Sequence, residues 1–515
     1  MLVIIITISC FTLSLTTDDF DGKQMTSSLK DLSHGDLTSV TSKASNDEWP
    51  FGRKLQMSTW RNLRYRLDYT LSNVLDAETD FFLKRVIINP VMIKLRQIVK
   101  VTGPSSIPRF NRTSCTSENE TDVYYKTNDV DTDLILFIKI TPINDNIIAY
   151  AGACMFSQAD KRPLAGLVVI NSNYIVKQYS AIEVLKGAIM HEVLHVLAFN
   201  VRLFDYFPVG KERTYVKETR VTASGTYEVY RIILPGLVQF GKRYYGCSTF
   251  NGVIFENEGG SSADSHLENS LHQGEMMTAV TNGIPILSHF TLYFLGSCGW
   301  YQVNYNYAQE YTWGRKKGCD FVTQQCNTRF SEFCAIEYQV KCSENRKRKV
   351  VCQKSSFGDG CILSTDFDSL NCANTNQFKK FTDLEVSGSD SFCFDMTYFG
   401  YAGAGCFQAY CEPNRIRVQV MDKSYYCDST TNGFAVGILT IKCPTYDQIC
   451  KKPEPENYEY VPCPGGCSGN GVCLIQRGVC ECYTFYTGAN CETYTGCTYD
   501  QSLCDKIIPP SVKAS

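Results

Sequence analysis

The sequence predicts an α+β fold over residues 56–318, followed by disulfide-rich and mostly β structure. Two apolar runs of strand length, at residues 134–140 and 164–170, precede a long apolar run with helical character at residues 181–198. A mixed sheet followed by a long buried helix is typical of an α+β domain. Beyond Cys319 the regular periodicity fades into short segments between cysteines, which favours a disulfide-stapled β structure.

The N-terminal segment has the features of a secretory signal. Residues 2–15 form a nearly uncharged apolar run that is too short to cross a bilayer comfortably. We therefore expect a signal peptide over residues 1–17 that is removed from the mature chain. Residues 18–55 are polar and contain no cysteine, which predicts a disordered leader or a short pro-segment.

Hydrophobic periodicity predicts the helices and strands of region 56–318. In chain order we first expect a strand at 61–69 and a helix at 76–88 that breaks at Pro90 and resumes to 99. Strands at 134–140 and 164–170 and the helix at 181–198 follow. We then expect irregular chain with short strands at 199–260 and a helix at 284–295 with Gly296 as its C-cap.

The helix at 181–198 contains the pattern His-Glu-x-x-His. Residues four apart lie on one helix face, so His191 and His195 can direct ring nitrogens at one point. Two imidazoles in this spacing provide half of a zinc site, and Glu192 can reach a metal-bound water as a general base. The alternative is a buried helix with two core histidines that are satisfied by hydrogen bonds.

A catalytic zinc site needs a third protein ligand. A compact third-ligand pattern would require Gly at position 198 and His at position 201, where this chain has Ala198 and Val201. His266 follows a Gly- and Ser-rich stretch that could bring it to the helix, whereas His289 is expected to be a packed helical residue. A rival arrangement takes its third ligand from a glutamate, for which Glu218 is the candidate.

Composition places the chain in an oxidising compartment. Most of its 26 cysteines lie between Cys319 and Cys504, and two glycosylation sequons begin at Asn111 and Asn119. The net charge of −3 and pI near 6.1 give no reason to expect nucleic acid as a partner. We find neither a later transmembrane segment nor a C-terminal lipid-anchor signal, so we expect a secreted, extracellular protein that could associate with the cell surface.

The C-terminal part divides into three pieces. Residues 319–452 form a cysteine-rich domain, the Pro-Glu repeat at 453–462 forms a stiff linker, and residues 493–515 form a tail. Between linker and tail, the six cysteines of residues 463–492 resemble an epidermal-growth-factor-like module, with a generic cysteine knot as the alternative. The resemblance implies an extracellular partner for the module and the pairs Cys463–Cys473, Cys467–Cys480 and Cys482–Cys491.

Several segments in shared order resemble the leishmanolysins, a metzincin branch of zinc endopeptidases. The matching pieces are Asp131-Thr132-Asp133-Leu134-Ile135-Leu136-Phe137, Ala149-Tyr150-Ala151-Gly152, Arg162-Pro163-Leu164-Ala165-Gly166, the His-Glu-x-x-His helix at 181–198, Ser265-His266-Leu267-Glu268, Gly299-Trp300-Tyr301-Gln302 and Trp313-Gly314-Arg315. They cover most of residues 63–326. The resemblance implies a metzincin-like catalytic region over 56–318 that is built from N-terminal and central subdomains.

The resemblance also implies roles for individual residues. His191, His195 and His266 would bind one catalytic Zn²⁺, Glu192 would be the general base, and Met277 would form the structural Met-turn beneath the metal. The family's disulfides imply the pairs Cys115–Cys154 and Cys247–Cys319. Removal of Cys10 with the signal leaves an odd number of cysteines, and the family usually has no cysteine just before its Gly-aromatic-Tyr. Cys298 is therefore expected to be a free buried thiol, with an intermolecular bond as the alternative. Where the family has a glycine, Ala198 would have to adopt a left-handed conformation, at a cost of about 1–2 kcal/mol.

The predicted function is that of a secreted zinc metalloendopeptidase for protein or peptide substrates. Glu192 would activate the zinc-bound water, and an edge strand at 134–140 or 164–170 would hold the extended substrate backbone. The alternative is a catalytically weak or inactive adhesion or recognition protein that uses the cysteine-rich and growth-factor-like parts. Ala198 is the one observation that favours the alternative.

Overall fold

The computed structural model describes residues 60–496, with gaps at 74, 104–106, 108–109, 112–114, 116–123, 126–131, 145–146, 259–262, 282, 344, 356, 374–378, 451–460 and 462, together with strand β1 (Met25–Thr26). The predicted signal peptide, most of the leader, the sequons apart from Asn111, most of the linker and the tail beyond 496 therefore lie outside the described residues. Strand β1 pairs antiparallel with β13 (Val280–Thr281).

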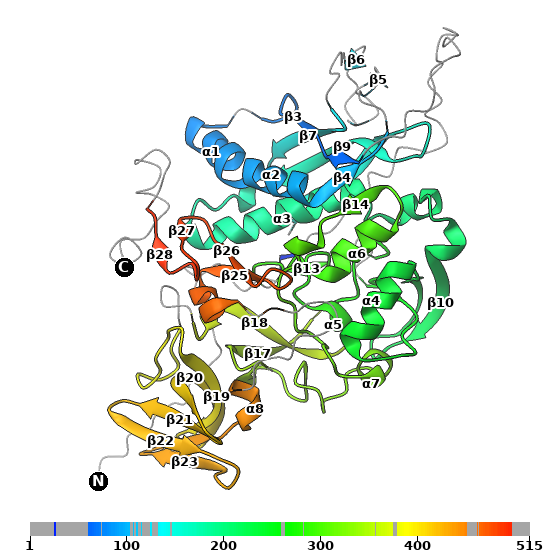
Figure 1. Ribbon diagram of the computed structural model, residues 1–515. Coiled ribbons are helices and arrows are strands. Elements are labelled where there is room, and N and C mark those ends of the chain that lie inside the picture. Colours follow the sequence, from blue (N-terminus) through cyan, green and yellow to red (C-terminus); the bar gives the residue numbers. More distant parts are fainter. Residues whose placement is uncertain are drawn as a thin grey trace.

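A four-stranded sheet and the long helix α3 (Tyr179–Leu197) form the upper part of the molecule in Figure 1. The strand order is β3 (Tyr65–Asp68), β7 (Leu134–Thr141), β9 (Pro163–Asn171) and β8 (Ala149–Phe156), with β8 alone antiparallel to its neighbour. Every residue of β9 is buried because the strand lies between two others and under α3. The predicted strands at 134–140 and 164–170 and the predicted helix are confirmed to within two residues at each end.

The predicted helix break at Pro90 is wrong. Helix α1 (Ala77–Phe81), a π-helical segment (Phe82–Ile88) and α2 (Asn89–Ile98) follow one another without interruption. Asn89 N–H donates to the carbonyl of Lys84, five residues back, so the wider π turns stand directly before the proline. A proline ring clashes with a regular α-helical turn, and a π turn relieves that clash while the buried face of the helix stays continuous.

Region 199–260 is more regular than predicted. It contains the hairpin of β10 (Tyr215–Val221) and β11 (Thr226–Ile232), the helix α4 (Pro235–Tyr245) and β12 (Val253–Ile254). Helix α4 begins at a proline in its first turn and ends at Gly246, which has a φ of 68°. The sequence analysis missed this helix, although both of its end signals are present.

Two further predicted elements have different bounds. The strand at 61–69 is interrupted between β2 (Arg61–Asn62) and β3, because the Arg64 backbone turns toward Asp133. Helix α6 (His289–Ser297) begins five residues later than predicted, because the Ser288 hydroxyl accepts a hydrogen bond from Phe290 N–H as an N-cap. Gly296 consequently lies inside the helix rather than at its C-cap.

The C-terminal part is mostly β, as predicted. One sheet contains β15 (Phe333–Cys334), β16 (Val340–Cys342), β17 (Arg348–Lys354) and β18 (Ile362–Asn371). A second sheet contains β19 (Ser391–Tyr398), β20 (Tyr401–Glu412), β21 (Arg415–Val420), β22 (Lys423–Cys427), β23 (Gly433–Val436) and β24 (Leu439–Lys442). The other α-helices and strands of this part are α7 (Cys319–Thr323), α8 (Tyr446–Ile449), β25 (Gly471–Leu474), β26 (Val479–Cys482), β27 (Tyr486–Thr487) and β28 (Thr493–Tyr494).

The remaining α-helices and strands lie before residue 319. They are β4 (Val99–Val101), β5 (Phe110–Asn111), β6 (Tyr124–Tyr125), α5 (Asn269–His272) and β14 (Tyr301–Val303).

Disulfides staple this part of the chain. The described residues contain eleven, and they include Cys115–Cys154, Cys247–Cys319 and the three pairs expected within residues 463–492. We call residues 463–492 the six-cysteine module. Cys298 is free and buried, and its thiol donates to the carbonyl of Leu295. Among the described helices, none is both long and apolar enough to cross a bilayer.

The first prediction concerns Asp133, which ties β2 and β3 to β7. Its buried carboxylate accepts hydrogen bonds from Arg61 Nη2 (2.5 Å) and from Arg64 Nε (2.8 Å). Burial raises the pKa of Asp133, but the bonds from Arg64 and Arg61 outweigh burial and lower it. Asp133→Asn should lower the free energy of unfolding at pH 7 by about 2–3 kcal/mol. This loss is smaller than the usual loss when a fully buried ion pair is broken, because both arginines are partly exposed and water screens the interaction.

The pH dependence of unfolding provides the control. A carboxyl with a lowered folded-state pKa stabilises the fold above its ordinary value of about 4, and that contribution is lost as pH falls through the folded-state pKa. The difference between wild type and Asp133→Asn in urea titrations should therefore shrink below pH 4. Equal unfolding free energies at pH 7 would contradict the prediction.

Candidate metal centre

Helix α3 carries two of the predicted site residues into the core. Its apolar residues are buried along almost the whole length, so helix packing rather than capping fixes its position. His191 and His195 lie one turn apart on the same face, with ring centroids separated by 4.5 Å. Both residues are almost completely buried, at 3% and 1% exposure.

Two glycines permit close packing around α3. A Cβ added at Gly166 of β9 would overlap the side chain of Val196, which is next to His195 in α3. A Cβ added at Gly187 would overlap the ring of Pro285, which lies shortly before α6. The sheet and the segment at 285–288 therefore approach the helix more closely than larger residues would allow.

The third histidine comes from a distant segment. The His266 carbonyl accepts a hydrogen bond from Glu256 N–H (2.9 Å), and Leu267 N–H donates to the carbonyl of Met277 (2.8 Å). The Nε2 atom of His266 lies 3.1 Å from that of His191 and 3.1 Å from that of His195, while the latter two are 2.9 Å apart. The structure thus brings together all three histidines that the sequence analysis singled out.

The other ring nitrogens of the helical pair are already occupied. His191 Nδ1 lies 2.6 Å from the carbonyl oxygen of Met276, and His195 Nδ1 lies 2.6 Å from that of Phe199. A carbonyl oxygen can only accept, so both Nδ1 atoms carry the proton and both Nε2 atoms present a lone pair. Burial lowers the pKa of His191 to about 4, and burial together with the neighbouring His191 and His266 lowers the pKa of His195 well below its ordinary value.

These rings fit a metal ion. Neutral imidazoles are the form that binds metal, and lone pairs that face one another about 3 Å apart repel unless a cation lies among them. Zinc–nitrogen bonds of about 2.0–2.1 Å in a tetrahedral arrangement place neighbouring nitrogens ~3.3 Å apart, slightly wider than observed. Among the described residues, the second group with ligand spacing is Cys463, Cys467 and Cys480, whose sulfurs are all in disulfides.

Glu192 is the predicted site residue whose hydrogen-bonding groups are least satisfied. Its side chain is 1% exposed, and within the described part of the chain neither carboxyl oxygen has a hydrogen-bond partner. Burial raises its pKa to about 8. An unpartnered buried carboxyl is costly, and a bound water or substrate at the histidine cluster would supply the missing partner.

The turn at residues 275–278 contacts the cluster through the Met276 carbonyl, and Met277 within it is fully buried. The Glu275 carboxylate fixes this turn by accepting hydrogen bonds from Met277 N–H (2.6 Å), the Ser288 hydroxyl (2.6 Å) and the Thr291 hydroxyl (2.7 Å). The sequence analysis missed Glu275. An acidic residue at the start of an otherwise uncharged buried run was the signal that could have identified it.

A second missed residue is Asp359, which belongs to the cysteine-rich part of the chain. Its carboxylate pairs with Arg220 (2.8 Å) and accepts from Asn257 Nδ2 (3.0 Å) and the Ser270 hydroxyl (3.4 Å). Asp359 therefore holds both ends of the segment that carries His266. Nothing in the sequence near Asp359 indicates this role, because its partners lie about 90 to 140 residues away.

The remaining sequence candidates have structural partners. His289 is buried against Phe240 and Tyr293, as expected for a packed residue. Glu218, the rival third ligand, lies on β10 in an ion pair with Arg231, outside the groups of described residues that have ligand spacing. The proposed substrate strands at 134–140 and 164–170 are corrected, because β7 and β9 each pair on both sides and have no free edge.

Ala198 also differs from the sequence expectation. It ends α3 with a φ of −160°, which is an extended conformation open to any residue, and its N–H donates to the carbonyl of Leu194. No left-handed penalty arises. The chain leaves the helix through Phe199, whose carbonyl meets His195, so the absence of a glycine does not disturb the cluster.

The geometry defines a candidate metal-binding protein: one helix supplies two histidines and an unpartnered glutamate, and a distant segment supplies a third histidine. A family model for leishmanolysin matches residues 76–427, more than half of the chain, and the chain therefore belongs to the leishmanolysin family.

Named relatives agree with this family. The chain is 28% identical to a leishmanolysin-like peptidase of Caenorhabditis elegans, with 44% of this chain and 40% of the relative aligned. It is 22% identical to a leishmanolysin-like peptidase of Drosophila melanogaster (59% and 60% aligned) and 24% identical to leishmanolysin of Leishmania donovani (62% and 61% aligned). The chain thus spans less than two thirds of each relative's length.

The second prediction tests Ala198. Because its backbone conformation suits alanine, Ala198→Gly should leave any peptidase activity unchanged within about twofold and should lower the free energy of unfolding by about 0.5–1 kcal/mol through the added freedom of the unfolded chain. Activity assays and urea titrations of both proteins measure the two effects. A large gain of activity in Ala198→Gly would show that alanine impairs the site.

Proposed function

We propose that this protein is a secreted zinc metalloendopeptidase that hydrolyses peptide bonds in extended protein substrates. The observation that supports the proposal best is the convergence of three imidazole Nε2 atoms within 3.1 Å of one another, together with the unpartnered carboxyl of Glu192 in the same helix. Membership of the leishmanolysin family supports a peptidase reaction.

In the proposed site, His191, His195 and His266 hold the ion through Nε2, and Met277 forms a Met-turn beneath them. The carbonyl oxygens of Met276 and Phe199 fix the tautomers and orientations of the two helical rings. A zinc ion, when bound, acts as a Lewis acid toward the scissile carbonyl and makes water a stronger nucleophile near neutral pH.

Glu192 performs the proton transfers. A nearby cation favours the carboxylate form, which accepts a proton from the attacking water. The resulting carboxylic acid then donates that proton to the leaving amine. The dry surroundings of Glu192 raise its proton affinity relative to an exposed glutamate, so both steps are accessible near neutral pH.

The substrate backbone would add to the edge of β8. Within the described strands, β8 is the edge of the four-stranded sheet next to β9, and α3 packs against the same sheet. An extended peptide can supply a further strand at such an edge through main-chain hydrogen bonds. This arrangement would select unfolded or loop segments of proteins rather than helices.

Sequence and disulfides together support the cellular setting that we propose. The eleven disulfides among the described residues fit an oxidising compartment, and residues 1–17 would serve as the signal peptide.

We propose a catalytic region at 56–318, a cysteine-rich domain at 319–452 and a growth-factor-like module at 463–492. The alternative of an inactive recognition protein loses its one sequence argument, because Ala198 adopts no strained conformation.

The third prediction separates metal binding from proton transfer. Glu192→Gln preserves the size of the side chain but cannot accept the proton, so zinc should remain at one ion per chain while kcat/KM falls by about 10²–10⁴-fold. Zinc content and casein digestion with and without a chelator measure the two effects. Exposed Glu212→Gln is the matched control, and an active Glu192→Gln protein would overturn the proposed base.

The fourth prediction concerns the third ligand. His266→Ala should weaken zinc binding by at least about 100-fold, because two imidazoles rarely hold a catalytic ion without a third ligand. Glu218→Ala should leave zinc binding unchanged, because Glu218 is paired with Arg231. Competition with a chromophoric chelator gives both affinities. Zinc retained by His266→Ala and lost by Glu218→Ala would favour the rival site.

A further inference from the structure

The six-cysteine module packs against the elements that form the metal centre. In Figure 1 its strands β25 and β26 lie beside α3, although they follow that helix by almost 300 residues in the sequence. Three disulfides hold this short module together. Two separate groups of contacts join it to the metal centre.

The first group attaches the module to α3. Thr484 donates hydrogen bonds from its backbone N–H (3.0 Å) and its hydroxyl (2.6 Å) to Glu183 Oε1, and Lys186 bonds to both Glu183 and Thr484. Burial raises the pKa of Glu183, but the Lys186 charge and the Thr484 bonds outweigh burial and keep the group ionised. Glu183 lies two helical turns before His191, so Thr484 anchors the zinc helix itself.

The second group attaches the module to the chain at 308–310, which in turn bonds to Leu287 before α6. Ile475 N–H donates to the carbonyl of Ala308 (3.2 Å) and Glu310 N–H donates to that of Cys473 (2.9 Å), so the two segments form an antiparallel β-bridge. Gln309 N–H and the Leu287 carbonyl bond at 2.9 Å, and the Gln309 amide oxygen accepts from Leu287 N–H at 2.8 Å.

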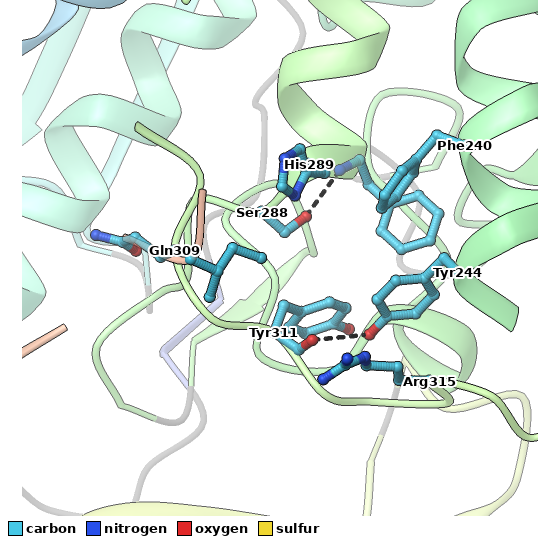
Figure 2. A pocket seen from close by; sticks show the side chains of 9 residues that line it. Phe240, Tyr244, Ser288, His289, Gln309, Tyr311 and Arg315 are labelled. Carbon is cyan, nitrogen blue, oxygen red and sulfur yellow. Dashed lines mark hydrogen bonds between the residues drawn. The ribbon is translucent and has the colours of Figure 1, made fainter. Parts of the chain in front are cut away.

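Gln476 completes this second attachment. Its amide lies 2.9 Å from Nε2 of His289, the first residue of α6. Figure 2 shows His289, Ser288 and Gln309 around a small cavity of about 10 Å³ that Ile475 of the module also lines. Since that volume admits at most about one water molecule, the module is closely packed against the start of α6.

A short series of hydrogen bonds links this contact to the histidines. Ser288 bonds to Glu275, which fixes the turn at 275–278, and the Met276 carbonyl in that turn orients His191. The Met277 carbonyl bonds to Leu267, next to His266. The module thus contacts the helix that carries His191 and His195 directly. It is linked to the turn at 275–278 indirectly, through His289, Ser288 and Glu275.

We propose that the six-cysteine module is a brace for the metal centre, in which Thr484 and Gln476 are positioning residues for the zinc ligands. The inference rests on the proposed function. Because the module bonds both to α3 and to the start of α6, it ties these two elements together from outside the histidine cluster. The face of the module that carries Thr484, Ile475 and Gln476 is covered by the rest of the chain. Arg477 and Val479 of the module are exposed to solvent.

The test uses the full-length protein loaded with Co²⁺ or Zn²⁺. The double variant Thr484→Val, Gln476→Ala should release Zn²⁺ to a chelator about tenfold faster, shift the visible absorption of the Co²⁺ form and lower kcat about tenfold with KM little changed, because small displacements of reacting groups are costly. Thr484→Ser keeps the hydroxyl and should behave as wild type. Arg477→Ala, on the exposed side, is the matched control.

The outcomes separate the two proposals. Unchanged metal release and an unchanged Co²⁺ spectrum in a folded double variant would overturn the brace while leaving the metallopeptidase intact. If the double variant fails to fold, Glu183→Gln provides the same test by weakening the bonds of Glu183 to Thr484 and Lys186. Wild-type metal release in Glu183→Gln would likewise overturn the brace. Wild type that binds metal but cleaves no protein would overturn the proposed function and leave the metal-release test of the brace valid.

Discussion

Three imidazole Nε2 atoms facing one another in a buried site are the constraint on which the rest of the structure depends. Without a cation they repel, and protonation would relieve the repulsion, but burial makes protonation of His191 and His195 unfavourable. The protein must therefore supply enough packing energy to hold the rings in place. The buried apolar residues of α3 and the carbonyls of Met276 and Phe199 provide that support.

The support is built from segments that are far apart in the chain. Asp359 holds the segment that carries His266, and Glu275 fixes the turn at 275–278. Thr484 anchors the helix that carries the other two histidines. Each of these contacts involves a charged group or a buried hydrogen bond, which is directional where apolar packing is not. The disulfides have a complementary role, because they keep the small C-terminal pieces folded so that these contacts can form.

The strongest sequence patterns predicted the fold where one element dominates its own packing. The strands β7 and β9 and the helix α3 were identified because long apolar runs can be buried in few ways. Pro90 and α6 were misjudged because a π turn and an N-cap at Ser288, both set by tertiary packing, moved the boundaries. Helix α4 was missed because its amphipathic pattern is short and surrounded by turns.

For the candidate site, the sequence alone determined which residue types are present: two histidines and a glutamate in helical spacing, with His266 and Met277 assigned by resemblance. Only the tertiary structure decided that the three rings meet, that Ala198 is unstrained, and that Glu275, Asp359 and Thr484 support the cluster. Helical spacing is local and follows from 3.6 residues per turn, whereas contacts between separate segments, up to about 300 positions apart, depend on how the whole chain packs.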